Sequence, residues 1–378
     1  MSSAGIFRVV RRDRSTAARA GILRTARGVI RTPVFMPVGT HATVKTVTPG
    51  ELKRAGAQII LSNAYHLHLR PGEDLIGDLG GLHRFMGWDG PILTDSGGYQ
   101  IFSLGEPKEL SDEGLTFKSH LDGSLHKLTP AQVIGIQQKL GVDIMMPLDE
   151  CPPYPASREQ IERAVDRTRV WLKESVDAWK RLKRPHGHLF GIVQGGVFED
   201  LRARAAREVD AMETPGIAIG GLSVGEPRHL LGKALSAAVE VIQPKKPRYL
   251  MGVGYPEDLF IGVERGVDMF DCVVPTRNGR NGTVFTSRGR LILRNAAFRR
   301  DRGPMDPKCP CEACQKYSLA YLRHLFMARE MLGLRLASLH NLTFFIKLLD
   351  DMRRSILDGR FLRFKNAFFE NYRSDNNK

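Results

Sequence analysis

Three aspartates stand in short motifs that combine a carboxylate with glycine, proline or an aromatic residue. Asp95 lies in TDSGGYQ, Asp149 in LDECPP and Asp271 in MFDCVVP. Each follows an apolar run. Burying a carboxylate costs free energy, so a buried one is expected to have a cationic partner or a functional role. Any one of the three, taken alone, has the alternative of capping a helix or pairing with an arginine.

Taken together, the three carboxylates predict chemistry at the anomeric carbon of a nucleoside. Two carboxylates flanking a glycosidic bond permit a double displacement, in which one attacks C1′ and the other handles protons. A third carboxylate can accept hydrogen bonds from N1–H and the exocyclic amine of guanine. The glycine pair after Asp95 lets a ligand approach the backbone closely, and Tyr99 offers an aromatic face to a flat ring. This chemistry needs no cofactor.

A second group of residues indicates a metal site. Cys309, Cys311 and Cys314 fall within six positions, and three thiolates so close in the chain favour zinc. A structural site needs a fourth ligand. His340, 26 positions after Cys314, and His324 are the two candidates, and three free cysteines in a turn are the alternative. Four protein ligands leave no place for water, so we expect the ion to be structural and not catalytic.

The elements that must position these side chains are short β-rich runs that alternate with amphipathic helical patterns. This alternation predicts βαβ units and a parallel sheet. The polar residues Asp95, Asp149, Gln194, Gly221 and Asp271 fall at or just past strand ends. A closed (β/α)₈ TIM barrel brings such ends to one mouth, whereas an open doubly wound sheet, the competitor, spreads them along an edge. The predicted strands are Thr32–Val38, Gln58–Asn63, Ile92–Asp95, Asp143–Asp149, His188–Gln194, Gly216–Gly220, Arg248–Gly252 and Met269–Val274.

Helices are predicted over Ser157–Lys183, Phe198–Met212, Arg228–Ile242 and Pro256–Arg265. Two segments break the alternation. Residues 103–129 contain Asp122-Gly123 between alternating residues, which predicts a hairpin. Residues 280–342 are basic, carry the cysteines and predict an inserted zinc-binding subdomain. The barrel is therefore expected over 1–279. The last barrel helix, roughly Thr343–Leu357, and a polar, frayed tail, Asn371–Lys378, are expected within 343–378.

The composition favours a polyanionic partner. The 378 residues include 56 Lys and Arg against 41 Asp and Glu, a net charge of +15. A basic surface with no anionic partner is the alternative. No apolar run is long enough to span a membrane, and the first residues do not resemble a signal peptide. Five cysteines, three of them clustered, suit a metal site in a reducing compartment, so a cytoplasmic location is expected.

The ordered set of motifs resembles the tRNA-guanine transglycosylase (queuine tRNA-ribosyltransferase) family from about Phe7 to Phe369. Besides the aspartate motifs, it includes QGG at 194–196, GGLSVGE at 220–226, YLMGVG at 249–254, DCVVPTRNGRNG at 271–282 and CxCxxC. The resemblance implies a TIM barrel with a zinc subdomain. It also implies exchange of guanine at the anticodon wobble position of tRNA for 7-aminomethyl-7-deazaguanine (preQ1), through a covalent tRNA–enzyme intermediate in queuosine biosynthesis.

The same resemblance implies a role for individual residues. Asp271 matches the nucleophile, Asp95 the general acid/base and Asp149 the carboxylate that reads the guanine edge. The other implied contacts to the base are Gln194, the N–H of Gly221, the carbonyl of Leu222, and the two sides of the slot, Tyr99 and Met251.

The resemblance also implies ligands and partners. The zinc ligands, one ion per subunit, match Cys309, Cys311, Cys314 and His340, which selects His340 over His324. Arg277 and Arg280 match contacts to the tRNA anticodon loop. Lys45 and the basic insertion are further candidates for phosphate contacts.

Val224 favours the bacterial, preQ1-using type, because its side chain would crowd the larger queuine base. The extra C-terminal domains of the archaeal type are not expected. The family implies a homodimer, for which Tyr317, Tyr321 and His324 on one helical face are candidate contacts, with core packing as the alternative.

Two other functions compete. A non-catalytic RNA-binding subunit is disfavoured because both Asp95 and Asp271 are present. A dinucleotide-dependent oxidoreductase is disfavoured because GVGYPE at 252–257 lacks the third glycine of G-x-G-x-x-G.

Overall fold

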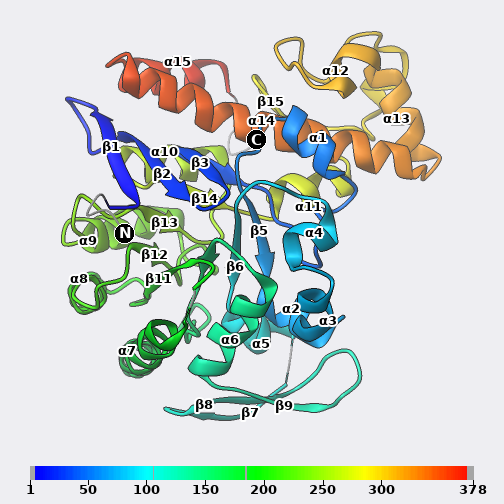
Figure 1. The fold of residues 1–378 in the computed structure, drawn as a ribbon. Coiled ribbons are helices and arrows are strands. Elements are labelled where there is room, and N and C mark those ends of the chain that lie inside the picture. The colour runs from blue at the N-terminus through cyan, green and yellow to red at the C-terminus, as the bar shows by residue number, and fades with distance from the viewer. Residues whose placement is uncertain (1–4, 105, 184, 373–378) are drawn as a thin grey trace.

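The computed structural model (Figure 1) describes residues 5–104, 106–183 and 185–372. Its central sheet consists of eight short parallel strands. A parallel bridge between Val38 and Leu61 joins the two outer strands, and the Leu61 N–H donates to the Pro37 carbonyl at 2.9 Å. The predicted (β/α)₈ barrel is therefore confirmed. The strands, in sheet order, are β4 (Val34–Met36), β14 (Met269–Asp271), β13 (Arg248–Leu250), β12 (Gly216–Ile219), β11 (His188–Val193), β10 (Ile144–Met145), β6 (Ile92–Asp95) and β5 (Ile60–Asn63).

Each strand is buried on both faces. Along β11, Phe190 and Ile192 pack in the cluster that fills the barrel, whereas Leu189 and Val193 pack in the cluster beneath the helices. Successive side chains of a strand point to opposite faces, so one run of apolar residues supplies both layers. The barrel interior is thus a packed core, and the polar residues at the strand ends are left to form its mouth.

The covering helices match the predicted ones to within three residues at either end. α7 (Arg158–Arg181) begins at a capping box between Ser157 and Gln160, which satisfies its free N–H groups. The others of this group are α8 (Glu199–Asp210), α9 (Arg228–Val239) and α10 (Pro256–Glu264). Helices α1 (Pro49–Arg54), α2 (Ala64–Leu69), α3 (Glu73–Asp78), α4 (Leu82–Met86), α5 (Gly98–Leu104) and α6 (Pro130–Leu140) come earlier in the chain.

Strand β10 is much shorter than the predicted strand Asp143–Asp149. The hydrogen-bond ladder of β10 ends after Met145 because the next residue, Met146, bonds to a side chain and not to a neighbouring strand. The fully buried Gln137 of α6 accepts from the Met146 N–H at 2.9 Å and donates to the Met146 carbonyl at 2.8 Å. The predicted strand Met269–Val274 was also too long, since β14 ends at Asp271 and α11 (Val274–Asn281) follows with a proline in its first turn.

A three-stranded antiparallel sheet that the sequence analysis did not anticipate precedes the barrel. It comprises β1 (Phe7–Arg12), β2 (Arg19–Thr25) and β3 (Gly28–Thr32). Phe7, Leu23 and Ile30 belong to the same apolar cluster as the barrel interior. The sheet therefore caps the barrel at the end away from the strand C-termini.

The predicted hairpin is confirmed. β8 (Gly114–Lys118) and β9 (Leu125–Leu128) flank the turn at Asp122-Gly123, and β7 (Glu106–Ser111) adds a third strand. Tyr65 of α2 donates to or accepts from Nδ1 of His120 at 2.8 Å, which ties the hairpin to the barrel near its mouth.

The cysteine-bearing segment folds into small elements of its own: β15 (Thr283–Thr286), β16 (Gly289–Ile292), the 3₁₀ helix η1 (Ala296–Arg300), α12 (Glu312–Lys316) and α13 (Leu319–Met327). The predicted last helix was wrong at its start, because α14 runs without a break over Met331–Leu357. Its first half, MLGLRLASLHNL, is apolar on several sides and shows no clear amphipathic period. α14 crosses the predicted domain boundary at residue 342. The division of the chain into domains at residues 279 and 342 stays a prediction.

α15 (Phe361–Asn371) follows α14 and packs its aromatic side chains around Phe260 of α10. Of the predicted tail, residues 373–378 lie outside the described residues. Within the described ranges, none of the helices combines the length and apolar character that a membrane crossing requires.

Candidate active site and metal centre

The predicted site residues stand at the C-terminal ends of the barrel strands. Asp95 is the last residue of β6, Asp271 is the last of β14, and Gln194 directly follows β11. Gly221 and Met251 follow β12 and β13 within two residues, and Asp149 follows β10. Because all eight strands run parallel, these ends share one mouth of the barrel.

Asp271 is buried and held by two donors on one oxygen. The Tyr249 hydroxyl and the Gly252 N–H each donate to Oδ1 at 2.7 Å. Burial raises the pKa of Asp271, and these two hydrogen bonds oppose that shift by favouring the carboxylate. Since both donors bind Oδ1, the second oxygen remains available to a substrate, as a nucleophile requires.

Asp95 is the carboxyl group of this site that is most disposed to keep a proton. Burial raises its pKa well above the ordinary value, and the nearby negative charges of Asp271 and Asp149 raise it further. Its Oδ1 atom is buried without a hydrogen-bond partner in the described part of the chain. Two neighbouring carboxyl groups whose surroundings shift their pKa values to different extents can serve as an acid and a nucleophile.

Asp149 forms a buried pair with Gln194. The Gln194 amide donates to Asp149 Oδ2 at 2.8 Å, and both side chains are buried. Burial raises the pKa of Asp149 to about 6, although hydrogen bonds from Gln194 and Ser96 favour its ionised form. Gly98 must lack a side chain here, because a Cβ would stand 2.5 Å from the Asp149 carbonyl oxygen.

The turn after β12 also depends on glycine. Gly221 has φ +63°, and a Cβ there would lie 2.3 Å from Oε1 of Gln194. Glu226 then accepts from the N–H groups of Ser223 and Val224, which fixes the turn that carries Leu222. The Gly221 N–H and the Gln194 amide are therefore brought together by the fold.

Two predicted base contacts are only partly placed by the structure. Met251 is half-buried, and its sulfur would lie 3.5 Å from a Cβ at Gly220, so it borders the same turn. Tyr99 lies on α5 and is 49% exposed, which leaves its ring free to stack. The roles of Tyr99, of Met251 and of the Leu222 carbonyl stay predictions.

The four predicted metal ligands form one buried group. The ligand atoms of Cys309, Cys311, Cys314 and His340 all lie within 4.8 Å of one another. His340 Nδ1 lies 3.2 Å from the Cys314 sulfur, while its Nε2 lies 2.7 Å from the Phe285 carbonyl. Nε2 therefore carries the proton, and the Nδ1 lone pair points at the thiols. A carbonyl that orients a histidine in this way is typical of metal sites. His324 is exposed and lies outside the group.

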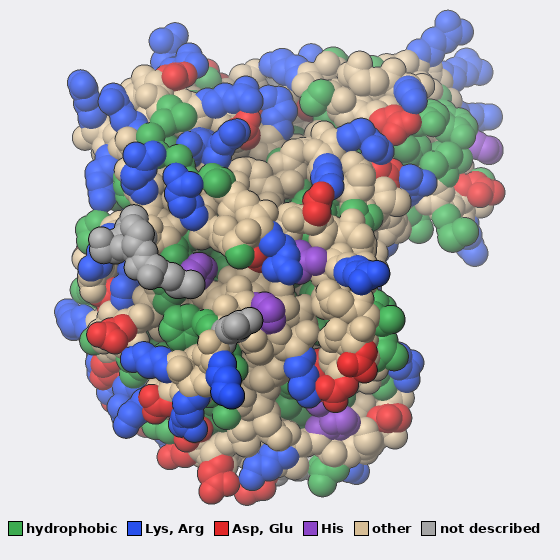
Figure 2. Space-filling view, in the orientation of Figure 1, with side chains coloured by type: hydrophobic (Ala, Val, Ile, Leu, Met, Phe, Trp, Pro, Cys, Tyr) green, Lys and Arg blue, Asp and Glu red, His purple; other side chains and the backbone are tan. Residues whose placement is uncertain are grey.

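The predicted RNA-contacting residues lie near the mouth. Arg277 is exposed and Arg280 is half-buried, both on α11, which follows the Asp271 strand. Burial lowers the pKa of Arg280, the charge of Arg277 lowers it further, and its Nη1 has no partner in the described ranges. Lys45 is exposed. The pKa of His66 is lowered to about 4, mainly by burial, and the nearby charge of Lys45 contributes to this shift. Lys and Arg are frequent on the face seen in Figure 2, especially over its upper part.

Sequence reasoning missed three groups. Tyr249 and the Gly252 N–H bind Asp271, and both lie inside the YLMGVG motif that was noted for other reasons. Arg202 is fully buried beneath the turns that carry Gln194 and Gly221. No local signal distinguishes Arg202, since it stands among charged residues in the sequence of α8.

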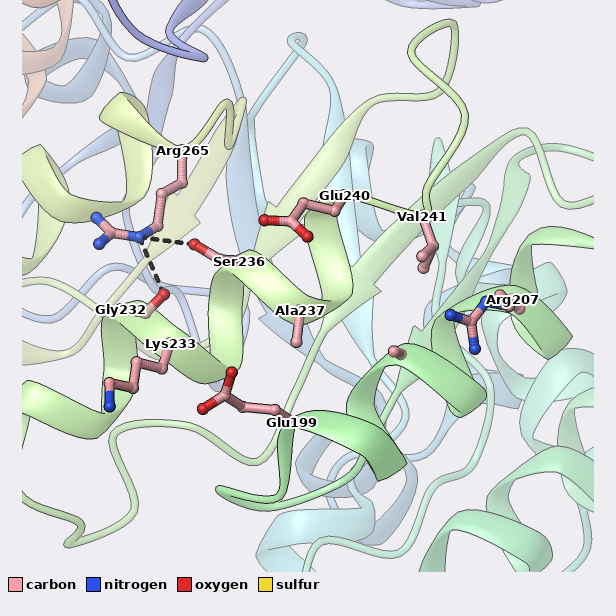
Figure 3. A pocket seen from close by; sticks show the side chains of 10 residues that line it. Glu199, Arg207, Gly232, Lys233, Ser236, Ala237, Glu240, Val241 and Arg265 are labelled. Atoms are coloured by element: carbon pink, nitrogen blue, oxygen red, sulfur yellow. Dashed lines mark hydrogen bonds between the residues drawn. The ribbon is translucent and has the colours of Figure 1, made fainter.

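A groove on the outside of the barrel lies apart from this site. About 330 Å³ in volume, it lies between α8 and α9, and Figure 3 shows Arg265 donating to the Gly232 carbonyl and the Ser236 hydroxyl there. Charges of both signs are spread along its walls, as with Glu199 and Lys233. None of the three aspartates lines it.

The amino-acid sequence is similar to a known protein family and to several of its members. A family model described as queuine tRNA-ribosyltransferase matches residues 13–374. A queuine tRNA-ribosyltransferase of Moorella thermoacetica is 55% identical, with 97% of this chain and 98% of the relative covered. The enzyme of that name from Pelotomaculum thermopropionicum is 53% identical, with 98% of this chain and 99% of the relative covered. The one from Enterococcus faecalis is 52% identical, with 97% of this chain and 96% of the relative covered.

Proposed function

The chain belongs to the queuine tRNA-ribosyltransferase family, and from that premise we propose that it exchanges guanine at the anticodon wobble position of tRNA for preQ1. As a member it is a tRNA-guanine transglycosylase, a pentosyltransferase of queuosine biosynthesis. The reaction proceeds through a covalent tRNA–enzyme intermediate, and the target nucleotide is drawn out of its loop into the barrel mouth.

In the first step Asp271 attacks C1′ of the ribose. A C1′–O bond to the carboxylate forms as the C1′–N9 bond breaks, and the electron pair of that bond passes to the purine. Asp95 supplies the proton that the departing guanine takes up. In the second step N9 of preQ1 attacks C1′, its proton passes to Asp95, and the ester to Asp271 breaks. Two inversions give net retention at C1′.

The observation that carries this proposal is that two buried carboxyl groups with different hydrogen-bond surroundings stand at one mouth of the barrel. The Tyr249 and Gly252 donors hold Asp271 ready as a carboxylate, while burial and two negative neighbours favour the acid form of Asp95. Asp149 and Gln194 stand beside them as a carboxylate and an amide suited to the edge of guanine.

The test is incorporation of labelled guanine into unmodified tRNA by the purified protein. We expect the label to become acid-precipitable with the RNA, and addition of preQ1 to displace it. Because one slot serves both bases, initial rates with tRNA and base varied together are expected to be ping-pong. Absence of incorporation would contradict the proposed function.

Val224 supports preQ1 over queuine as the incoming base. Its side chain is half-buried in the turn whose N–H groups bind Glu226, close to the predicted position of the aminomethyl group. A branched side chain there leaves less room for the larger ring of queuine.

The exchange rate is expected to fall as the pH drops below about 6. Asp149 must be ionised to accept from N1–H and the exocyclic amine, and its pKa is raised to about 6, so the accepting form is present above that pH and is lost below it. Apparent KM for the free base, measured from pH 5 to 8, should rise at the acidic end. The Asp149→Asn variant should bind the base weakly, with no such rise, and an unchanged pH profile in that variant would contradict the assignment.

tRNA affinity is expected to depend on salt, through Arg277, Arg280 and Lys45. Each cation that neutralises a phosphate contributes to the slope of log affinity against log salt. The Arg277→Ala variant should therefore reduce that slope by about 1 and weaken all tRNA substrates equally. Lys180→Ala, an exposed cation on α7 paired with Glu213, serves as the matched control and should leave the slope unchanged. Equal slopes for wild type and Arg277→Ala would show that Arg277 makes no phosphate contact.

We further propose that the metal is zinc, one structural ion per chain, held by Cys309, Cys311, Cys314 and His340. The ion would fix the insertion against α14, and it supplies no step of the exchange. The buried set of three thiolates and one imidazole suits zinc, with His340 oriented by the Phe285 carbonyl.

A homodimer acting in the cytoplasm is the assembly we propose. Tyr317 lies between α12 and α13 and does not share the predicted helical face, but its ring stacks on that of Tyr321 of α13 with centroids 5.4 Å apart, and Tyr321 is 39% exposed. Met327 and Met331 nearby are 55% and 80% exposed. An exposed patch of aromatic and methionine side chains favours a protein interface over core packing.

A further inference from the structure

Arg202 is a fully buried arginine whose hydrogen bonds all go to the backbone of the base-binding turns. Its Nε donates to the Gly196 carbonyl at 2.8 Å, and its Nη2 donates to the Gly221 carbonyl at 2.9 Å. Its Nη1 donates to the carbonyls of Gly220 and Val193, at 2.7 and 3.2 Å. One side chain of α8 thus links the ends of β11 and β12.

The positive charge of Arg202 is not neutralised by an ion pair in the described part of the chain. Arg19, another fully buried arginine, lies 2.5 Å from an oxygen of the buried Asp268. A buried charge without an ion pair is costly, so the four backbone carbonyls around the Arg202 guanidinium are what stabilises it. The surroundings of Arg202 therefore indicate what the charge acts on.

The Gly220–Gly221 peptide connects this charge to the proposed base slot, because the Gly221 backbone and the Gln194 side chain both contact the buried Cys151 thiol beside Asp149. The carbonyl of that peptide accepts from Arg202 Nη1, and the N–H on its other side is the Gly221 N–H. The two groups of a trans peptide point in opposite directions. A cation on the carbonyl polarises the peptide and makes its N–H a stronger donor, as in chains of cooperative hydrogen bonds.

We propose that Arg202 is a positioning residue that makes the Gly221 N–H a strengthened donor to the 6-oxo group of the purine, and thereby selects bases that carry this oxygen. The inference rests on the proposed function, since it assigns the ligand of the Gly221 N–H. When the C1′–N9 bond breaks, part of the developing negative charge reaches the 6-oxo oxygen, where the strengthened donor stabilises it.

The test is equilibrium binding of three free bases to the tRNA-free protein, measured by calorimetry or, for 2-aminopurine, by its fluorescence. Guanine and hypoxanthine carry the 6-oxo group, and 2-aminopurine lacks it. For Arg202→Gln we expect guanine and hypoxanthine to weaken by the same factor, about tenfold, and 2-aminopurine by less than about twofold. Arg202→Lys keeps the charge and should retain part of the preference for oxo bases.

Arg248 provides the matched control. It is also buried, it donates to the carbonyls of Ile242 and Gly266, and burial lowers its pKa to about 10, as for Arg202. It stands at the start of β13, at the end of the barrel away from the mouth. Arg248→Gln should lower the melting temperature and leave the ratio of guanine to 2-aminopurine affinity unchanged.

The possible outcomes separate the two proposals. If the wild type does not bind guanine, the proposed function fails. If the wild type prefers guanine and both Arg202 variants keep the full preference, the positioning role of Arg202 fails while the function stands. Should Arg202→Gln not fold, Arg202→Lys alone decides, because a purely structural role predicts equal losses for all three bases.

Discussion

Replacement of Asp271 by Asn is expected to abolish base exchange, with a loss of at least about a thousandfold in the rate of guanine incorporation. An amide oxygen cannot form the ester to C1′ that the double displacement needs. The variant should still fold, because an amide oxygen can accept from the Tyr249 hydroxyl and the Gly252 N–H as the carboxylate does.

Two measurements check this expectation. The first is labelled guanine incorporation, and the second is the RNA adduct that survives denaturation, which wild type should form and Asp271→Asn should not. Asp143→Asn is the matched control. Asp143 is also buried, but it precedes β10 and accepts from the Ile92 N–H at the other end of the barrel. It should lower stability and keep the exchange. An active Asp271→Asn enzyme, or an adduct on another residue, would overturn the nucleophile assignment.

Loss of one metal ligand is expected to have the second largest effect, on stability. In Cys311→Ser, bound zinc measured by atomic spectroscopy should fall from about one per chain to near zero. Metal binding in closed cysteine and histidine sites contributes on the order of 10 kcal/mol to folding. The melting temperature should therefore drop by more than about 10 °C. Chelation of the wild type at elevated temperature should reproduce the shift.

Cys151→Ser separates the metal from the general effect of removing a buried thiol. Cys151 is also buried and lies outside the ligand group, so this variant should keep its zinc. A Cys311→Ser protein with full metal content would contradict the ligand assignment. A metal-free protein that melts like the wild type would show instead that the ion does not stabilise the insertion.

The sequence predicted the barrel because each strand leaves a local mark. Apolar runs such as those ending at Asp95 and Gln194 have the length of a strand and finish on a polar residue. Their alternation with helical patterns implies a parallel sheet. The metal site was equally local, since Cys309, Cys311 and Cys314 lie within six positions. Only the choice of His340 over His324 needed more than spacing, and in the structure His340 is the histidine that lies among the three thiols.

Features that depend on contacts between residues far apart in the chain could not be predicted from local sequence patterns. β10 ends early because Gln137 of a neighbouring helix binds the backbone of Met146. The first half of α14 is apolar on several sides because the insertion covers it, so its helical period is obscured. The N-terminal sheet was missed although its strands alternate, since only its packing on the barrel interior shows what it covers.

The kind and order of the candidate residues could therefore be read from the sequence alone, because residue types and apolar runs are local properties, whereas the roles expected of Asp95, Asp149 and Asp271 came from the family resemblance. What only the tertiary structure decides is how these carboxyl groups differ, since burial and the approach of Asp271 and Asp149 raise the pKa of Asp95 well above its ordinary value. The same holds for Arg202: in the sequence it is one of several charged residues of a helix, and only the packing of α8 on the barrel places its guanidinium against the carbonyls of Gly196 and Gly220.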